Sequence, residues 1–308
     1  MERLDGGSAL PPAFRGGIVA LGNFDGFHAG HQAVADEAIR WAHALGRPAI
    51  IATFDPHPVR FFRPDTPPFR LTTLDQRQRL FAQAGADAML VFGFDAALAG
   101  LSARQFCGER LVAHAGAAGV VTGADFTFGK GRDGDVHVLA MLGETLGFSA
   151  RIVAPVSDGE VISSSRIRAA LQAGDPREAT RLLTRPFAVE GVVEHGAKLG
   201  RQLGYPTANL SMGQYLRPAY GIYAVRGHLA DGRVLDGAAN LGIRPTIEGQ
   251  ATELLEPYFF DFSGDLYGQR IEVEFIDFIR PEGRFDSLDA LKDQMARDCD
   301  AARAALAR

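Results

Sequence analysis

The chain has few cysteines and no long apolar run, and each scarcity excludes a class of protein. Among its 308 residues only Cys107 and Cys299 are cysteines, and they lie far apart without Cys-x-x-Cys or metal-type spacing. They are expected to be free thiols and not part of a disulfide framework or a zinc site. No run approaches the roughly 18 apolar residues of a membrane span, and Met1 to Gly7 lacks the apolar core of a secretory signal. We therefore expect a cytoplasmic protein with no membrane partner.

Charge of a single sign is also scarce. The formal net charge is −5, from 32 basic and 37 acidic residues mixed along the chain. No basic field is present to hold a nucleic acid backbone, so a nucleic acid partner is not expected and an anionic small substrate would need local groups. Nothing in the sequence indicates an obligatory protein partner. The apolar fraction of 46% and the charged fraction of 22% are typical of a globular protein.

The sequence changes character near residue 185, which predicts two domains, 1–185 and 186–308. In the first half, five short apolar runs alternate with helical segments such as His31 to Leu45 and Ser102 to His114. This is the pattern of a parallel sheet with crossover helices. The five runs, each apolar enough to be covered on both faces, are Ile18 to Leu21, Ala49 to Phe54, Met89 to Phe92, Gly119 to Thr122 and Arg151 to Ala154.

From Ala188 to Ile279 a period of two replaces the helical period, which predicts a small antiparallel β-barrel or sandwich. Asp231-Gly232 is typical of a hairpin turn within it. The final segment, Leu288 to Ala307, has helical spacing and is expected to pack one face against the β domain.

The first candidate site is the stretch Gly22 to His31, which follows the first apolar run. His28 and His31 stand at the start of the first crossover helix, where backbone N–H groups favour anions. Gly26 and Gly30 would let phosphate oxygens approach the backbone. Alternatively, either histidine simply caps the helix. A second polar cluster follows the fifth run. Taken alone, this cluster could be an ordinary helix start. Together with the Gly22 to His31 stretch, it would enclose an anion site. Its members are Ser163, Ser164, Ser165 and Arg168.

These two segments resemble the adenylyltransferase half of bacterial bifunctional riboflavin kinase/FAD synthetases. Phe54 to Pro58 and Gly123 to Gly129 match further segments of that family. The resemblance implies a Rossmann-like nucleotidyltransferase fold and adenylylation of FMN by ATP, with His28, His31 and Arg168 in catalytic roles. It implies ATP phosphate contacts from Gly22, Asn23, Phe24, Asp25, Gly26, Gly30, Ser163, Ser164 and Ser165. It implies flavin contacts from Phe54, Pro56, His57, Pro58, Asp125, Phe126 and Phe128, although Pro56-His57-Pro58 could equally be a rigid turn.

The second candidate site lies in the β half, where a glycine-rich stretch leads to Pro206-Thr-Ala-Asn209. Thr207 and Asn209 are neutral oxygen donors two residues apart, which face the same side of an extended segment and suit Mg²⁺. The stretch is not a Walker A loop. Taken alone, it could be a turn in which both side chains bond local backbone.

This stretch is similar to the signature of the riboflavin kinase domain. The resemblance implies that Thr207 and Asn209 hold Mg²⁺ with ATP and that Gly200 and Arg201 contact phosphates. It also places a glutamate, here Glu256, where it would position and deprotonate the riboflavin 5′-hydroxyl.

The sequence departs from that family beside Glu256. Pro257 stands where a strand residue with an N–H is usual, and Tyr258 where histidine is common. Because proline donates no ladder hydrogen bond, Pro257 is expected at an edge position or a bulge. A slip of one residue in the alignment would turn Glu256 away from the site.

The resemblance therefore implies two reactions with Mg²⁺: riboflavin and ATP give FMN and ADP in the C-terminal half, then FMN and ATP give FAD and pyrophosphate in the N-terminal half. Two alternatives stay open. One keeps a single activity, with the other half as a flavin-binding domain. The other is a non-catalytic flavin sensor.

Overall fold

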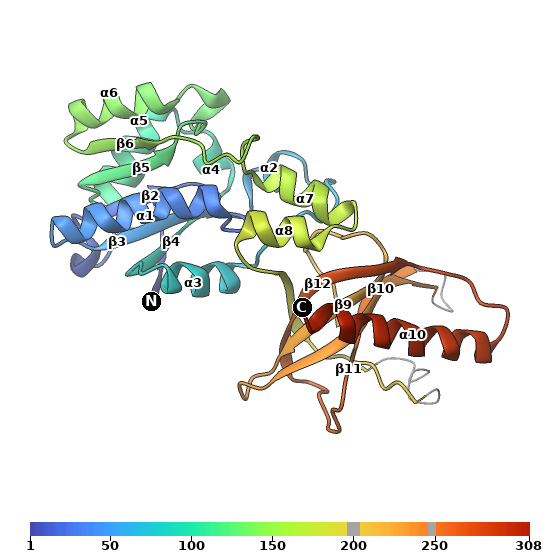
Figure 1. Cartoon of the computed structure of the whole chain (residues 1–308). Helices are drawn as coiled ribbons and strands as arrows, with labels where there is room; N and C mark the ends of the chain where they lie inside the picture. The colour runs from blue at the N-terminus through green and yellow to red at the C-terminus, as the bar shows by residue number, and fades with distance from the viewer. Residues whose placement is uncertain (196–203, 246–250) are drawn as a thin grey trace. The chain divides into compact units, whose positions relative to one another are not determined.

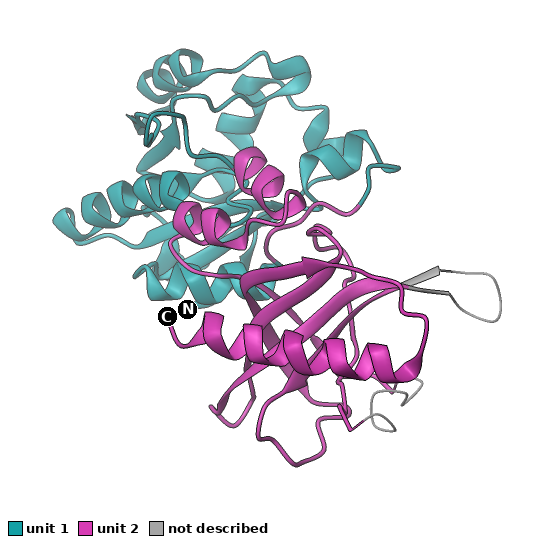
Figure 2. Cartoon of the chain, turned by 45° about the vertical axis from the view of Figure 1, so that its right-hand side comes forward, with its two compact units in different colours: residues 1–67, 73–163 teal, residues 68–72, 164–308 magenta. Residues whose placement is uncertain are grey.

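The computed structural model describes residues 1–195, 204–245 and 251–308, which form two compact units (Figure 2). The first unit comprises Met1–Pro67 and Thr73–Ser163, and the second comprises Pro68–Thr72 and Ser164–Arg308. Helices α7 (Ser164–Gln172) and α8 (Pro176–Leu183) precede the change in composition at residue 185 but belong to the second unit. A domain boundary at residue 185 stays a prediction. Within the described ranges, no helix combines the length and apolar character needed to cross a membrane.

The first unit is built on a six-stranded parallel sheet of order β1-β4-β3-β2-β5-β6 (Figure 1). Its strands are β1 (Glu2–Asp5), β2 (Ile18–Leu21), β3 (Ala49–Asp55), β4 (Ala88–Gly93), β5 (Gly119–Gly123) and β6 (Ser149–Val153). The parallel sheet is as predicted, and the chain order reverses between β2 and β5. A reversal of this kind leaves a crevice at the carboxyl ends of the two strands, where open α/β sheets bind ligands.

Two details of the sheet differ from the sequence prediction. β1 was not expected, because Glu-Arg-Leu-Asp is polar; it pairs as an edge strand on β4. The run around Arg151 was expected to be covered on both faces, but β6 is an edge strand whose Ile152 is 44% exposed. A strand at the sheet edge does not need two apolar faces, so composition alone overstated its burial.

Helices cover both faces of this sheet. Helices α1 (Ala29–Ala44) and α3 (Leu74–Gln83) pack against one face, with Val34, Ala38 and Phe81 in a shared apolar cluster. The π-helical stretch η2 (Phe106–His114) and helix α6 (Val136–Leu146) cover the other, through Phe106 and Leu139. The shorter helices are η1 (Pro12–Phe14), α2 (Pro58–Phe62), α4 (Ala96–Ala99), α5 (Ala103–Gln105) and η3 (Lys130–Arg132).

The second unit is a nearly closed antiparallel barrel of order β7-β12-β9-β10-β11-β8. Its strands are β7 (Phe187–Val192), β8 (Leu210–Ser211), β9 (Gly221–His228), β10 (Val234–Pro245), β11 (Ala251–Phe259) and β12 (Arg270–Pro281). A bridge between Glu194 and Asn209 joins the segments that follow β7 and precede β8, so the two ends of the order meet. The predicted Asp231-Gly232 turn connects β9 to β10.

Helix α10 (Leu288–Leu306) lies on the outer face of this barrel, as predicted (Figure 1). Its carboxyl-terminal half is anchored by an apolar cluster in which Ala302 and Leu306 meet Ala224, Ala238 and Phe260 of the sheet. The alternation of strand side chains makes this possible: Val225 and Leu241 face the barrel interior, whereas their neighbours Ala224 and Asn240 face outward.

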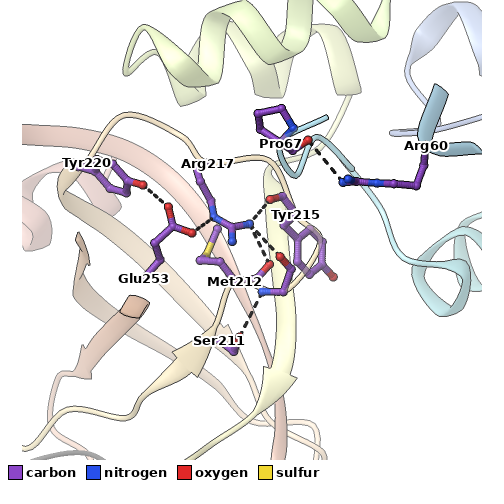
Figure 3. Close-up of polar contacts among 9 residues, drawn as sticks. Arg60, Pro67, Ser211, Met212, Tyr215, Arg217, Tyr220 and Glu253 are labelled. Atoms are coloured by element: carbon purple, nitrogen blue, oxygen red, sulfur yellow. Dashed lines mark hydrogen bonds and ion pairs between the residues drawn. The ribbon is translucent and has the colours of Figure 1, made fainter. Parts of the chain in front are cut away.

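A small polar network fixes the connection between β8 and β9 to strand β11 (Figure 3). Arg217 Nε donates to Glu253 Oε2 at 2.6 Å, and its Nη1 donates to the carbonyls of Gly213, at 3.0 Å, and Tyr215. Tyr220 donates its hydroxyl to the other Glu253 oxygen. Burial opposes the charge on Glu253, but the hydrogen bonds from Tyr220 and Arg217 outweigh it and lower the pKa of this carboxyl. Burial, followed by the bond to Glu253, raises the pKa of Tyr220 to about 12.

Replacing Glu253 by glutamine should lower the free energy of unfolding of the barrel unit by about 1 kcal/mol at pH 7, measured by urea unfolding. A lowered carboxyl pKa stabilises the folded state above the unfolded pKa of about 4.3, and this contribution is lost as the pH falls through the folded value. A raised tyrosine pKa gives a contribution that is present below about pH 10 and is lost as the pH rises through the folded value. The difference between wild type and variant should therefore be largest between these limits.

The matched control is Asp231→Asn, which removes the charge of the exposed Asp231–Arg233 pair, with side chains 52% and 56% exposed. It should leave the free energy of unfolding nearly unchanged, because solvent screens an exposed pair. An equal loss in both variants would show that the Glu253 network contributes no more than a surface pair.

Candidate active sites

The turn between β2 and α1 holds Gly22 to His28 in a strained backbone. Phe24 and Phe27 have φ angles of 50° and 43°, and Gly26 has 88°, so three nearby residues adopt left-handed conformations. Residues other than glycine seldom adopt these angles without compensating contacts. Here the two phenylalanine rings are buried and meet Phe81 at centroid distances of 5.8 and 4.9 Å. Asp25, between them, is only 2% exposed.

His28 and His31 come together at the first turn of α1. Their rings are stacked with centroids 3.7 Å apart and an interplanar angle of 22°. His28 is the N-cap of the helix, because its Nδ1 accepts a hydrogen bond from the His31 backbone N–H at 3.4 Å. In the neutral tautomer this leaves Nε2 of His28 as the N–H donor. The capping alternative is thus correct for His28.

Gly30 packs closely against the His28 ring. A Cβ at position 30 would lie 3.2 Å from Cε1 and Nδ1 of His28 and 3.4 Å from the carbonyl oxygen of Ile162. The carbonyl contact also places Ile162, and hence the start of the serine segment, beside the first turn of α1. Glycine therefore allows close packing of protein groups here, and phosphate access at Gly30 stays a prediction.

Arg77 supports the turn between β2 and α1 through hydrogen bonds, and sequence reasoning missed it. It is 2% exposed, and its Nη1 donates to the Asn23 carbonyl at 3.1 Å and to Thr53 Oγ1 at 2.7 Å. Thr53 in turn donates to the same carbonyl at 2.8 Å. Arg77 stands in a helix with many polar residues, so the sequence gave no signal that its side chain is buried. Only the tertiary contacts reveal its role.

The serine and arginine cluster is divided between the two units. Ser163 ends the first unit, whereas Ser164, Ser165 and Arg168 lie in α7 of the second. Within that unit, Arg168 Nε donates to the Phe69 carbonyl at 2.9 Å and its guanidinium carbon lies 5.2 Å from the centre of the Phe69 ring. A phosphate site shared by the histidines and this cluster stays a prediction.

Three of the predicted flavin residues, Phe54, Phe126 and Phe128, belong to a lane of aromatic rings on one face of the first unit's sheet. Phe54 meets Phe106 at 6.5 Å, and Phe106 meets Phe128 at 5.7 Å, which stacks on Phe126 at 5.6 Å. Sequence reasoning missed its other end, which consists of Phe61, Phe62 and Phe94. Phe62 is 65% exposed, so an apolar surface is open to a ligand there.

The Pro56-His57-Pro58 segment forms the start of helix α2. His57 is its N-cap, with Nδ1 accepting from the Val59 N–H at 3.2 Å, and Pro58 occupies its first turn. The Asp55–Pro56 peptide bond is cis. The rigid-turn interpretation therefore describes the backbone, and flavin contact by Pro56, His57 and Pro58 stays a prediction. Asp125, also predicted to contact flavin, is exposed at the end of β5.

The second unit contains a cavity of about 390 Å³ between the outer face of the β9–β10–β11 sheet and helix α10. Glu256 and Thr207, which are far apart in sequence, both line it. Asn240 lies directly opposite Glu256 in the β10–β11 register and lines it as well. The remaining lining residues are Tyr205, Ile222, Ala238, Ala239, Tyr258, Arg280, Glu282, Gly283, Phe285, Leu291, Met295, Asp298 and Cys299.

The two departures from the family pattern are accommodated here. Pro257 lies beyond the short strand β8, and its carbonyl faces that side, accepting a hydrogen bond from the Ala208 N–H at 2.9 Å. Because the N and C=O of a strand residue point to the same side, the missing N–H is not required by β10. β11 lies between β10 and β8 and pairs with β10 without a register shift at Pro257, so the expected edge position or bulge is wrong. Proline is accommodated because its nitrogen faces away from β10, past the last residue that pairs with β8. Tyr258 faces the cavity and packs edge-on against Tyr205 at 5.2 Å.

Asn209 offers a donor suited to a hard cation. The residue is 5% exposed, and its buried Oδ1 has no hydrogen-bond partner among the described residues. A buried amide oxygen of this kind is costly unless a ligand satisfies it. Thr207, two residues earlier, lines the cavity. The oxygen donors of Thr207 and Asn209 fit Mg²⁺, because this ion takes few protein ligands and completes its coordination shell with phosphates and water. Gly200 and Arg201, the predicted phosphate contacts, lie outside the described residues.

The parallel sheet with its left-handed turn after β2, and the barrel with its cavity, define the class: an α/β unit of the nucleotide-binding type followed by a β-barrel unit. A family model described as FAD synthetase matches residues 10–166, and one described as riboflavin kinase matches residues 183–306. The chain belongs to the family of bifunctional riboflavin kinase/FMN adenylyltransferases.

Relatives of that name are similar in sequence to this chain over nearly their whole length. The Pseudomonas fluorescens protein is 41% identical, covering 99% of this chain and 97% of its own. The Bacillus subtilis protein is 34% identical, covering 91% and 90%. A solved structure from Streptococcus pneumoniae, named a macrolide-efflux protein, is 31% identical, covers 98% of this chain and 99% of its own, and has a TM-score of 0.87.

Cys299, which lines the cavity, should report on it through its reactivity, and the buried Cys107 of the first unit provides a comparison. Burial, with the nearby charge of Asp298, raises the pKa of Cys299 to about 11, and burial raises the pKa of Cys107 to about 12. The rate of Cys299 alkylation by iodoacetamide should therefore rise about tenfold per pH unit from pH 7 to 10, because only the thiolate reacts. Cys107, with no exposed surface, should stay unmodified.

Peptide mass spectrometry measures both rates, with urea-unfolded protein as the control in which both thiols react alike. A Cys299 rate that reached its plateau below pH 9 would contradict the environment described for this thiol.

Proposed function

We propose that the barrel unit phosphorylates riboflavin to FMN and that the α/β unit adenylylates FMN to FAD, in each case with ATP. The observation that carries the proposal is that Glu256 and Thr207 line one cavity in the unit that matches riboflavin kinase. The substrates are small molecules, and the mixed surface charge gives no support for a nucleic acid partner. A cytoplasmic location belongs to the same proposal.

In the kinase step, Glu256 accepts the proton of the riboflavin 5′-hydroxyl as that oxygen attacks the γ-phosphorus of ATP and ADP leaves. Asn240, its cross-strand neighbour, is close enough to hold either the carboxylate or the substrate. Thr207 and Asn209 are the residues that would hold Mg²⁺. When bound, the ion neutralises phosphate charge and orients the displacement.

In the adenylylation step, a phosphate oxygen of FMN attacks the α-phosphorus of ATP and pyrophosphate leaves. No covalent intermediate on the protein is required. His28 and His31, stacked at the positive end of α1, would donate hydrogen bonds to the charge that develops on the α-phosphate. The aromatic lane that includes Phe54 and Phe128 would receive the apolar flavin ring, because stacking on aromatic side chains suits a flat heterocycle.

Two substitutions should separate the activities. His31→Ala should reduce FAD formation from supplied FMN by about a hundredfold and leave FMN formation from riboflavin nearly unchanged, because it removes one donor to the developing charge. Asn209→Ala should do the reverse, because it removes a metal ligand in the other unit.

Chromatographic separation of riboflavin, FMN and FAD measures both reactions in one assay. Equal damage to both activities in a folded variant would refute the division between units. Binding of flavin with no change in ATP concentration would favour the sensor alternative, and wild-type protein that forms only one product would favour a single activity.

Glu256→Gln should lower kcat for riboflavin phosphorylation by a factor of about 100 or more, with a much smaller change in KM, because it removes the proton acceptor and keeps the shape. Glu253→Gln is the matched control. It lies on the same strand, but an odd spacing of three residues puts it on the opposite face, away from the cavity.

Steady-state rates at saturating ATP provide the test. A Glu256→Gln enzyme with unchanged kcat would remove Glu256 from the chemistry, and a Glu253→Gln enzyme with the same loss would attribute the effect to the strand as a whole.

A further inference from the structure

A buried ion pair forms part of the cavity wall and is not used by the mechanism above. Arg280, at the end of β12, donates from Nε to Asp298 Oδ1 at 2.8 Å and from Nη2 to Oδ2 at 2.6 Å. The two side chains are 22% and 6% exposed, and both residues line the cavity. The register places Arg280 opposite Ile222, which lines the same cavity. The pair therefore joins the sheet to helix α10 at the cavity itself.

Arg280 also holds a second wall. Its Nη1 donates to the Pro281 carbonyl at 2.9 Å, and its guanidinium carbon lies 5.6 Å from the centre of the Phe285 ring, which lines the cavity. On the helix side, Gln294 Nε2 donates to Asp298 Oδ1 at 2.9 Å. One guanidinium thus connects the end of β12, the segment 281–285 and helix α10.

Stability alone does not account for this pair. Replacing a buried ion pair by apolar residues is often neutral or stabilising, because desolvation offsets the attraction. Moreover, the carboxyl-terminal half of α10 is already held by the cluster around Ala302 and Leu306, and by Arg226, which donates to the Leu306 carbonyl at 3.1 Å.

What the pair adds is control of the other half of the helix. Asp298 is the first buried residue of α10, and the residues before it, including Leu291 and Met295, reach the cavity without being buried themselves. The position of this stretch relative to the sheet therefore depends on the Arg280–Asp298 contact. A bidentate pair fixes both the distance and the orientation of its partners.

We propose that Arg280 and Asp298 are positioning residues that set the cavity wall against which riboflavin binds, so that they control affinity for riboflavin and not the phosphoryl-transfer step. This inference rests on the proposed function of the cavity. Asp298 holds the helix wall, Arg280 holds the segment 281–285, and Glu256 on the opposite sheet wall carries out the proton transfer.

The test uses the full-length protein with Arg280→Lys, Asp298→Asn and Gln294→Ala. Lysine keeps the charge but loses the planar fork, and asparagine keeps the shape but leaves the guanidinium charge unpaired. Riboflavin affinity is measured twice: as Kd from quenching of riboflavin fluorescence without ATP, and as KM at saturating ATP. Both values should rise about tenfold for Arg280→Lys and Asp298→Asn and about twofold for Gln294→Ala, while kcat stays within about twofold.

Two controls isolate the cavity effect. Adenylylation of supplied FMN by the other unit should be unchanged in all three variants, which confirms intact protein. Asp261→Asn breaks a second ion pair of α10, in which Arg303 Nη1 donates to Asp261 Oδ2 at 3.1 Å; Asp261 is exposed and does not line the cavity. It should leave Kd and KM for riboflavin unchanged.

The double variant Arg280→Lys with Asp298→Asn should weaken riboflavin binding by far less than the product of the two single effects, because both changes disrupt one interaction. Unchanged Kd in folded single variants, or a fall in kcat without a rise in Kd, would overturn the proposal. If either of these variants failed to fold, an unchanged Kd in Gln294→Ala would overturn it. Wild-type protein that bound riboflavin but formed no FMN would instead refute the kinase function and leave the binding measurements as the test of the pair.

Discussion

The pairing of β10 with β11 is the constraint on which the kinase half depends. It sets Asn240 opposite Glu256 and Ala238 opposite Tyr258, and these four residues share the outward face that α10 covers. Because side chains alternate along a strand, a slip of one residue would turn Glu256 into the barrel interior and bring Leu255 out. The interior leucines, with no exposed surface, make that slip costly, so the hydrophobic core selects the register in which Glu256 lines the cavity.

The α/β half depends on a different constraint, the backbone of the turn that leaves β2. Left-handed angles at Phe24 and Phe27 are unfavourable alone, and buried ring contacts with Phe81 offset them. Arg77 then fixes the Asn23 carbonyl. The strained residues lie where the chain turns sharply from the buried strand β2 into the start of α1. This turn places two stacked imidazoles at the positive end of that helix. Rigid support of this kind suits chemistry in which the protein contributes position and fixed charge.

Much of this organisation could be predicted from the sequence, because the local pattern of apolar residues matches the burial of the elements that they form. The run Ile18 to Leu21 is apolar throughout and the run Gly119 to Thr122 is apolar up to its last residue, and they form the central strands β2 and β5. Where the burial of a residue depends on a segment far away in the sequence, the prediction was wrong or could not be made. The run near Arg151 became an exposed edge, the polar segment Glu2–Asp5 became a strand by pairing with β4, and Arg77 gave no sign of being buried. In each case the deciding partner is distant along the chain.

The sequence by itself determined the two kinds of fold, the helix start that carries His28 and His31, and the motif that carries Thr207 and Asn209, because periodicity and spacing are local properties. Only the tertiary structure decided that Glu256 and Thr207 share a cavity, that β10 needs no N–H from Pro257, and that Arg280 meets Asp298. These contacts join segments far apart in the chain. They arise from strand register and from the packing of α10, which are set by the energy of the whole core and not by any short stretch of residues.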